Sequence, residues 1–198
     1  MSRFRFVLLF VSVLILAACG GNERSSRLMI DDLELVPLKT SQISNFLIIL
    51  PSVLDFSKKY RDNLPLTEQA QDAAEYNQKF FATLSQSSRF QEASRSAGFT
   101  NLNECILVYR NVLLAYVEIK NEFTNDVTNQ IADLREKIAQ VGKSVDEELS
   151  QKNLPRDKKQ YLEDQKTELR THTLLLSNIM VVSEFTATLD AEQGLRTN

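Results

Sequence analysis

Apolar residues recur at helical spacing along most of the chain beyond residue 40, which predicts a fold built from α-helices. The longest stripe runs from Leu102 to Leu149 in steps that mostly alternate between four and three residues. It crosses Gly142 without losing phase, so we expect one helix over about residues 101–152. At about 1.5 Å per residue this helix would be about 75 Å long. A second long helix is expected over about residues 156–190.

A sharp turn separates these two expected helices. In the sequence KNLPRD, Asn153 tolerates the left-handed conformation after a helix, and Pro155 suits the first position of the next one. Folding the chain at this turn places residues whose numbers sum to about 307 opposite each other. The facing apolar pairs would be Val145 with Leu162, Ile138 with Leu169, Ile131 with Leu176, and Val127 with Met180. The pattern therefore predicts an all-α fold with a long antiparallel, coiled-coil-like hairpin.

The apolar residues of this hairpin are unevenly distributed. Residues 133–170 are rich in charge around a thin apolar seam, whereas residues 106–119 and 174–189 are apolar on most faces. A helix that is apolar all round needs partners on several sides. We therefore expect a helical bundle at the base of the hairpin and a charged tip that projects from it.

The helices between residues 41 and 97 are expected to pack on this base. The run at residues 46–50, FLIIL, is apolar on every face, as a buried helix requires. Helix-capping and helix-breaking residues divide the region. They predict an N-cap at Ser41, a kink or break at Pro51, an N-cap at Thr67, a break near residues 85–88 and a helix end before Gly98.

The N-terminus has the pattern of a cleavable signal. Arg3 and Arg5 precede an almost unbroken apolar run of 13 residues, Phe6 to Ala18. A membrane-spanning helix needs about 20 residues, so this run is too short to span but has the length of a signal-peptide core.

The residues Leu16-Ala17-Ala18-Cys19 resemble the lipobox of bacterial lipoproteins. The resemblance implies cleavage before Cys19, a thioether-linked diacylglycerol on its sulfur and acylation, for example by palmitate, of the new amino terminus. The alternative is an ordinary secretory signal with an incidental cysteine. Gly20 rather than Asp follows the cysteine, and by the resemblance this favours the outer membrane, facing the periplasm, over the inner membrane.

Three regions follow from these patterns: a signal peptide at residues 1–18, a lipidated tether at residues 19–40 and a single helical domain at residues 41–198. The tether is rich in Gly, Asn and Ser at first and lacks a sustained helical period. Its later residues, LMIDDLELV, are compatible with an extended stretch or short turn against the body. Its acidic residues Asp31, Asp32 and Glu34 are interpreted as a solvated stretch rather than a cation site.

Composition narrows the chemistry further. The formal net charge is −3, and loss of residues 1–18 would remove two arginines and no acids, so neither nucleic acid nor anionic lipid is an expected electrostatic partner. His172 is the single histidine, which excludes a two-histidine metal site within one chain. We expect no catalytic residues, no cofactor, no metal and no enzymatic activity. Cys105 is expected to be a buried apolar side chain; the alternative is an intermolecular disulfide.

The expected function is that of a membrane-anchored lipoprotein of the bacterial cell envelope, acting as a non-catalytic interaction or structural module. Its expected partners are the membrane, through lipid on Cys19, and either another protein or a second copy, through the helical hairpin. The alternative is a periplasmic binding or chaperone-like module that holds an apolar ligand or client between the base helices.

Overall fold

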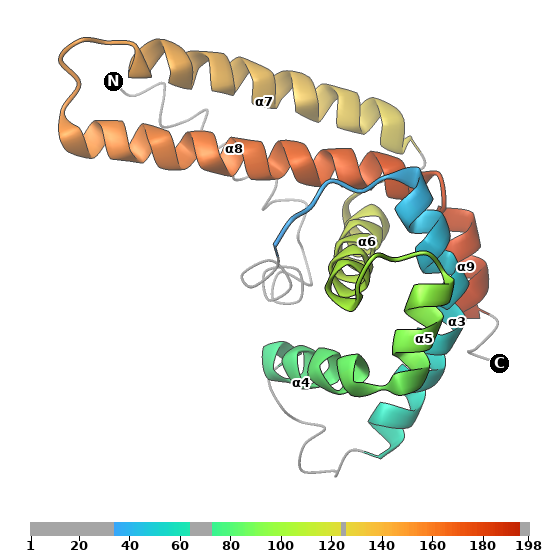
Figure 1. Cartoon of the computed structure of the whole chain (residues 1–198). Coiled ribbons are helices and arrows are strands. Elements are labelled where there is room, and N and C mark those ends of the chain that lie inside the picture. The colour runs from blue at the N-terminus through green and yellow to red at the C-terminus, as the bar shows by residue number, and fades with distance from the viewer. Residues whose placement is uncertain (1–33, 64–72, 124–125, 195–198) are drawn as a thin grey trace.

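The computed structural model describes residues 34–63, 73–123 and 126–194, and within them the regular elements are all helices (Figure 1). The predicted all-α fold is confirmed. The helices are α3 (Thr40–Asp62), α4 (Ala73–Gln86), α5 (Ser88–Ser96), α6 (Leu102–Glu122), α7 (Val127–Leu149), α8 (Arg156–Ser183) and α9 (Thr186–Gly194). The predicted signal peptide, Cys19 and Thr67 lie outside the described residues.

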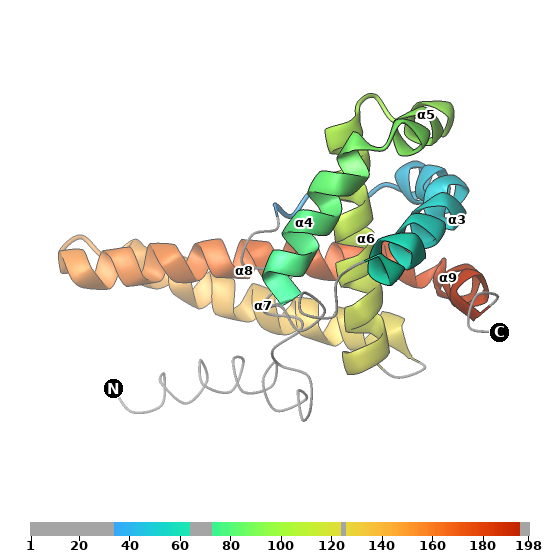
Figure 2. The same ribbon diagram turned by 90° about the horizontal axis from the view of Figure 1, so that it is seen from below.

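Helices α7 and α8 lie side by side and antiparallel, joined by a turn at the sequence KNLPRD (Figures 1 and 2). In this turn Pro155 is the N-cap of α8 rather than its first residue, and Asn153 does not have the expected left-handed conformation. Ion pairs link the two helices near this turn, from Lys158 to Glu148 at 2.7 Å and from Lys166 to Asp146. Both members of two expected facing pairs are buried; these are Val145 with Leu162 and Ile131 with Leu176.

The prediction of a single helix over residues 101–152 is wrong, because the helix is interrupted between α6 and α7. Phe123 ends α6 in an extended conformation, with φ −109° and ψ 138°. Asp126 then starts α7 as its N-cap, accepting a hydrogen bond from the Asn129 N–H at 3.4 Å. An Asp side chain that satisfies the free N–H groups of a first turn favours a helix start over continuation. The apolar spacing does not reveal this break, since α6 and α7 both bury the same stripe.

The helix expected over residues 156–190 is also divided, into α8 and α9, whose axes differ by 68°. At the bend, side-chain hydroxyl groups donate hydrogen bonds to nearby main-chain carbonyls. Ser183 donates to the Met180 carbonyl and Thr186 to the Ser183 carbonyl. Such local bonds compete with the helical ladder. No single described helix is long and apolar enough to cross a membrane, whereas α8 and α9 taken together across the bend meet that length and composition.

Pro51 does not break α3, which continues through it from Thr40 to Asp62. Proline inside a helix costs about 3 kcal/mol through its missing N–H and its crowding of the preceding turn. The flanking residues Leu50 and Val53 are both buried, 4% and 0% exposed. Tertiary packing on both sides of the proline thus holds the helix together.

The N-cap expected at Ser41 is wrong, because α3 already begins at Thr40. The expected break at residues 85–88 and the helix end before Gly98 are confirmed. Ser87 caps α5 and separates it from α4, within the break expected at residues 85–88. Gly98 follows the end of α5 with φ +93°, and the Phe99 and Gly98 N–H groups bond back to the carbonyls of Ser94 and Arg95. This is the Schellman pattern of a helix C-terminus, which needs a left-handed residue and hence favours glycine.

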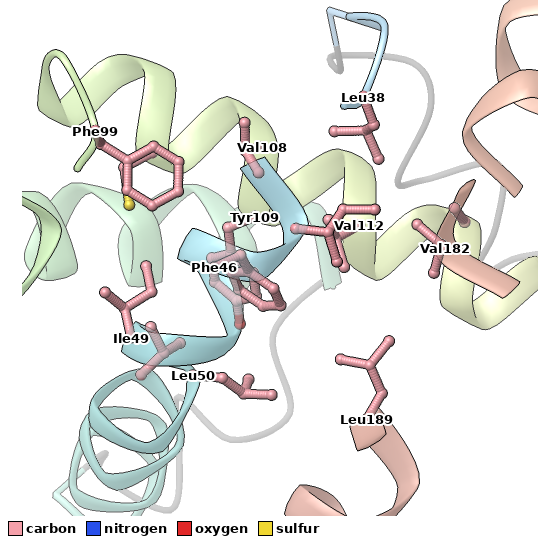
Figure 3. Close-up of a cluster of buried hydrophobic side chains, with 14 of the residues drawn as sticks. Leu38, Phe46, Ile49, Leu50, Phe99, Val108, Tyr109, Val112, Val182 and Leu189 are labelled. Atoms are coloured by element: carbon pink, nitrogen blue, oxygen red, sulfur yellow. The ribbon is translucent and has the colours of Figure 1, made fainter. Parts of the chain in front are cut away.

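The base of the hairpin contains the main hydrophobic core (Figure 3). The apolar runs of α3 and α8 contribute to one buried cluster together with α6 and α9, and Phe46 stacks on Tyr109 with ring centroids 5.4 Å apart. Members from these four helices include Phe46, Ile49, Leu50, Tyr109, Val112, Ile179, Val182 and Leu189. The broadly apolar segments therefore contribute to one core, although Ile48 of the run FLIIL is 65% exposed. Val145 and Leu162 lie outside this cluster, in the projecting part of the hairpin.

Candidate functional site

Two asparagines are buried where α6 crosses α8. Asn111 of α6 is 0% exposed and Asn178 of α8 is 1% exposed. The Asn178 side-chain amide donates to Asn111 Oδ1 at 3.3 Å, so the two helices are joined by a direct amide–amide contact. Burying an amide without partners costs about 1–3 kcal/mol, which means that a stable fold must supply the remaining hydrogen bonds.

The chain just before α3 supplies those bonds. Asn111 Oδ1 accepts from the Val36 N–H at 3.2 Å, and Asn178 Oδ1 accepts from the Leu38 N–H at 2.9 Å. The Asn111 amide donates to the Glu34 carbonyl at 3.1 Å, and the Asn178 amide donates to the Val36 carbonyl at 2.9 Å. Residues 34, 36 and 38 therefore present one edge of an extended chain to the two asparagines, as alternate residues of a strand do.

Every atom that this segment offers to the asparagines belongs to the main chain. The segment's buried side chain is Leu38, which is 7% exposed and joins the core cluster (Figure 3). The two asparagines thus recognise an extended backbone, and Leu38 adds apolar burial. We call residues 34–38 the docked segment, and Asn111 with Asn178 the amide pair. The last residues of the region 19–40 thus lie against the body, as in the extended stretch considered for LMIDDLELV.

A surface pocket of about 590 Å³ lies beside the docked segment. Val36 and Pro37 form one wall, Gln42 of α3 contributes, and the first two turns of α6 form the rest. Its one carboxylate, on Glu104, already accepts hydrogen bonds from the Thr100 N–H and the Gln42 amide, at 3.0 and 3.2 Å. The Thr100 hydrogen bonds are the main cause that lowers the pKa of Glu104. This carboxylate therefore links α6 to α3 through its hydrogen bond with Gln42.

A second polar cluster joins α6 to α9. Asp190 accepts a hydrogen bond from the Tyr116 hydroxyl at 2.6 Å and an ion pair from Lys120 at 2.7 Å. Lys120, followed by Tyr116, lowers the pKa of Asp190, whereas burial, followed by Asp190, raises the pKa of Tyr116 to about 12. The Tyr116 hydroxyl and the Lys120 ammonium of α6 thus both bind the carboxylate of Asp190 and link α9 to α6 at the surface.

Neither sequence-selected side chain of the body forms a reactive arrangement. Cys105 is 0% exposed, and burial raises the pKa of its thiol to about 11. It is the buried apolar side chain that the sequence predicts, and an intermolecular disulfide would require α5 and α6 to open. His172 is half-buried on α8. Within the described ranges, no group of three or more His, Cys, Asp or Glu side chains could hold a metal ion.

The amide pair was not among the sequence-predicted sites. Its signal was present in the pattern, because Asn178 interrupts the apolar run LLLSNIMVV and Asn111 lies within the apolar stripe of α6. A polar residue inside an otherwise buried face needs a fixed partner. Sequence spacing does not identify that partner, which comes from a segment about 70 to 140 residues away.

Comparison of the chain with protein-family models, with curated proteins and with solved structures gave no match.

Proposed function

We propose that the chain is a membrane-anchored lipoprotein of the bacterial cell envelope that acts as a non-catalytic interaction or structural module. The anchor rests on the lipobox-like residues Leu16 to Cys19. Two or three acyl chains at one residue hold a protein stably on a membrane, whereas a single chain is marginal. The outer membrane, facing the periplasm, is the proposed location, since Gly20 follows the cysteine.

The projecting hairpin is the observation that carries the interaction role. Helix α7 packs mainly on α8, and the two helices extend together away from the other described helices (Figure 1). Its tip combines acidic residues at the end of α7 with basic residues at the start of α8. A charged rod held away from a compact base suits contact with a protein partner or with a second copy of the chain.

Metabolic labelling tests the anchor. Cells that express the full chain are fed an alkyne fatty acid, and the protein is isolated and coupled to a reporter dye. We expect labelling of the wild type and none of the Cys19→Ala variant, with Cys105→Ala as the matched control that keeps its label. Equal labelling of wild type and Cys19→Ala would refute the anchor.

Photo-cross-linking in cells tests the hairpin. A photoreactive residue is placed at Gln151 or Lys152, both exposed in the turn, and at Ser41 on the exposed face of α3 as a control. We expect a defined higher-mass adduct from the tip positions and not from Ser41. Absence of tip adducts would remove the interaction role, and an adduct of twice the chain mass would identify self-association.

The alternative role, holding an apolar ligand or client between the base helices, has less support. The apolar runs that suggest it fill the base by packing against one another. The described pocket lies at the surface beside the docked segment, and its walls are partly polar.

A further inference from the structure

The docked segment is attached to the body in a way that differs from the helices. Four hydrogen bonds from the amide pair and the burial of Leu38 hold it on the crossing of α6 and α8. Releasing it would uncover two amides and one leucine and would unfold no helix, because α3 begins only at Thr40. A segment held in this way can open locally while the helices stay folded.

The docked segment lies between Cys19, the proposed lipid attachment site, and the start of α3 at Thr40. If the lipid is on Cys19, the link between membrane and body ends at Glu34 when the segment is docked and at Lys39 when it is released. At about 3.4 Å per residue, residues 20–33 span at most about 48 Å, and residues 20–39 about 68 Å. Docking thus shortens the reach of the body by about 20 Å and fixes its attachment at the α6–α8 crossing.

We infer that Asn111 and Asn178 form a tether lock: a backbone-binding site that sets how far, and from which point, the helical body extends from its lipid anchor. This inference rests on the proposed lipid anchor. Because the lock reads main-chain atoms, side chains at positions 34 and 36 are replaceable, whereas the N–H groups of Val36 and Leu38 are required.

A matched pair of proline substitutions separates the lock from general chain stiffness. Val36→Pro removes the N–H that Asn111 accepts, and Leu35→Pro makes the same change where the N–H takes no part in the network. Neither substitution touches a helix. We expect the Leu38 amide to exchange with solvent at least tenfold faster in Val36→Pro than in Leu35→Pro, with amides near Val145 unchanged in both. Asn178→Ala, which removes the acceptor of the Leu38 N–H, should give the same result.

Energy transfer on vesicles tests the reach. The full lipidated chain is reconstituted in phosphatidylethanolamine–phosphatidylglycerol vesicles that contain an acceptor dye. A donor dye is placed on Gln151→Cys at the hairpin tip, and buried Cys105 should not compete for labelling. We expect lower transfer efficiency for Val36→Pro than for wild type, and no change for Leu35→Pro.

Each result has a distinct meaning. Equal exchange of the Leu38 amide in both proline variants would overturn the lock, and so would equal energy transfer in the two. Failure of the wild type to sediment with vesicles would refute the lipid anchor, and the tether role with it. In that case slow exchange at Leu38 would still show that docking occurs, so loss of the anchor and loss of the docking can be told apart.

Discussion

At the scale of single residues, buried polar side chains of similar chemistry have opposite surroundings in this protein. Asn111 and Asn178 have main-chain partners for their amide and carbonyl groups. Gln165 of α8 is 6% exposed, and neither its amide nitrogen nor its carbonyl oxygen has a hydrogen-bond partner among the described residues. Folding therefore stabilises the first two amides and is opposed by the third, since an unpaired buried amide keeps its desolvation cost.

Replacing Gln165 by leucine should stabilise the protein. The substitution removes two unpaired polar atoms from the α7–α8 seam and retains a side chain of similar volume. We expect the free energy of unfolding to rise by about 1–2 kcal/mol, measured by urea denaturation followed by circular dichroism. Gln160→Leu, the same change at an exposed position of α8, should alter it by less than about 0.5 kcal/mol. A destabilised Gln165→Leu variant would show that Gln165 has a partner in solution.

Gly142 offers a second stabilising change. A Cβ atom built there meets nothing within 4 Å, and the residue lies inside α7. Gly142→Ala should therefore raise the free energy of unfolding by about 0.5–1 kcal/mol, through helix propensity and reduced freedom of the unfolded chain.

Gly98→Ala is the matched control for this change. At Gly98 φ is +93° and a Cβ would lie 3.3 Å from the Asn45 amide nitrogen. The same substitution should thus destabilise the protein by about 1 kcal/mol or more. Equal effects at both glycines in the same urea titration would contradict this account.

At the scale of elements, the sequence predicts helices better than it predicts their ends. Gly98 after a helix end, the break at residues 85–88 and the turn at KNLPRD are found where the sequence predicts them, because each depends on one or a few local residues. The α6–α7 break and the α8–α9 bend were missed. The spacing of apolar residues does not change at either position, so it does not predict these helix ends. The side-chain hydrogen bonds found at the two positions are seen only in the structure.

Predictability differs in the same way for the candidate site. Asn178 stands out in an apolar run, but its partners are the Leu38 and Val36 main-chain groups, which carry no sequence signature. When side chains bind main-chain atoms, only the side-chain partners, here the asparagines, can be recognised in the sequence. Pro51 shows the converse, since a strong local breaker is overruled by burial of Leu50 and Val53.

The attachment of α9 should depend on pH through Asp190. Lys120 and Tyr116 lower its pKa from the ordinary value of 3.8, so the folded state favours the carboxylate. This stabilisation is present above the unfolded pKa and is lost as pH falls through the lower folded pKa. Asp190→Asn should cost about 0.5 kcal/mol at pH 7, as expected for a half-exposed ion pair, and the difference from wild type should shrink below about pH 4. Urea titrations of both proteins between pH 3 and 7 measure this difference in the free energy of unfolding. A difference that stayed constant over this range would contradict the proposed role of Asp190.

At the scale of the whole molecule, α8 connects the parts. Its first half forms the projecting hairpin with α7, its second half joins the core with α3 and α6, and Asn178 holds the docked segment (Figure 1). One continuous helix thus carries part of the proposed contact surface at one end and Asn178, which binds the docked segment, near the other. A force on the hairpin would reach the α6–α8 crossing through its backbone.

The two halves of α8 should nevertheless differ in stability. Val145 and Leu162 are buried in the hairpin but stand outside the core cluster, whereas Ile179 belongs to it. Elements with few buried partners open locally below the global free energy of unfolding. Leu162→Ala should therefore speed amide exchange around Val145 and leave exchange in α6 unchanged.

Ile179→Ala removes a side chain that is 2% exposed within the main core. It should lower the global free energy of unfolding by about 2–4 kcal/mol and speed exchange of the slowest amides in α3, α6 and α8 together. Exchange measured by mass spectrometry on both variants distinguishes the cases. If Leu162→Ala accelerated α6 as much as the hairpin, the molecule would unfold as one unit. The hairpin could then not open or rearrange on a partner while the base and its docked segment stay folded.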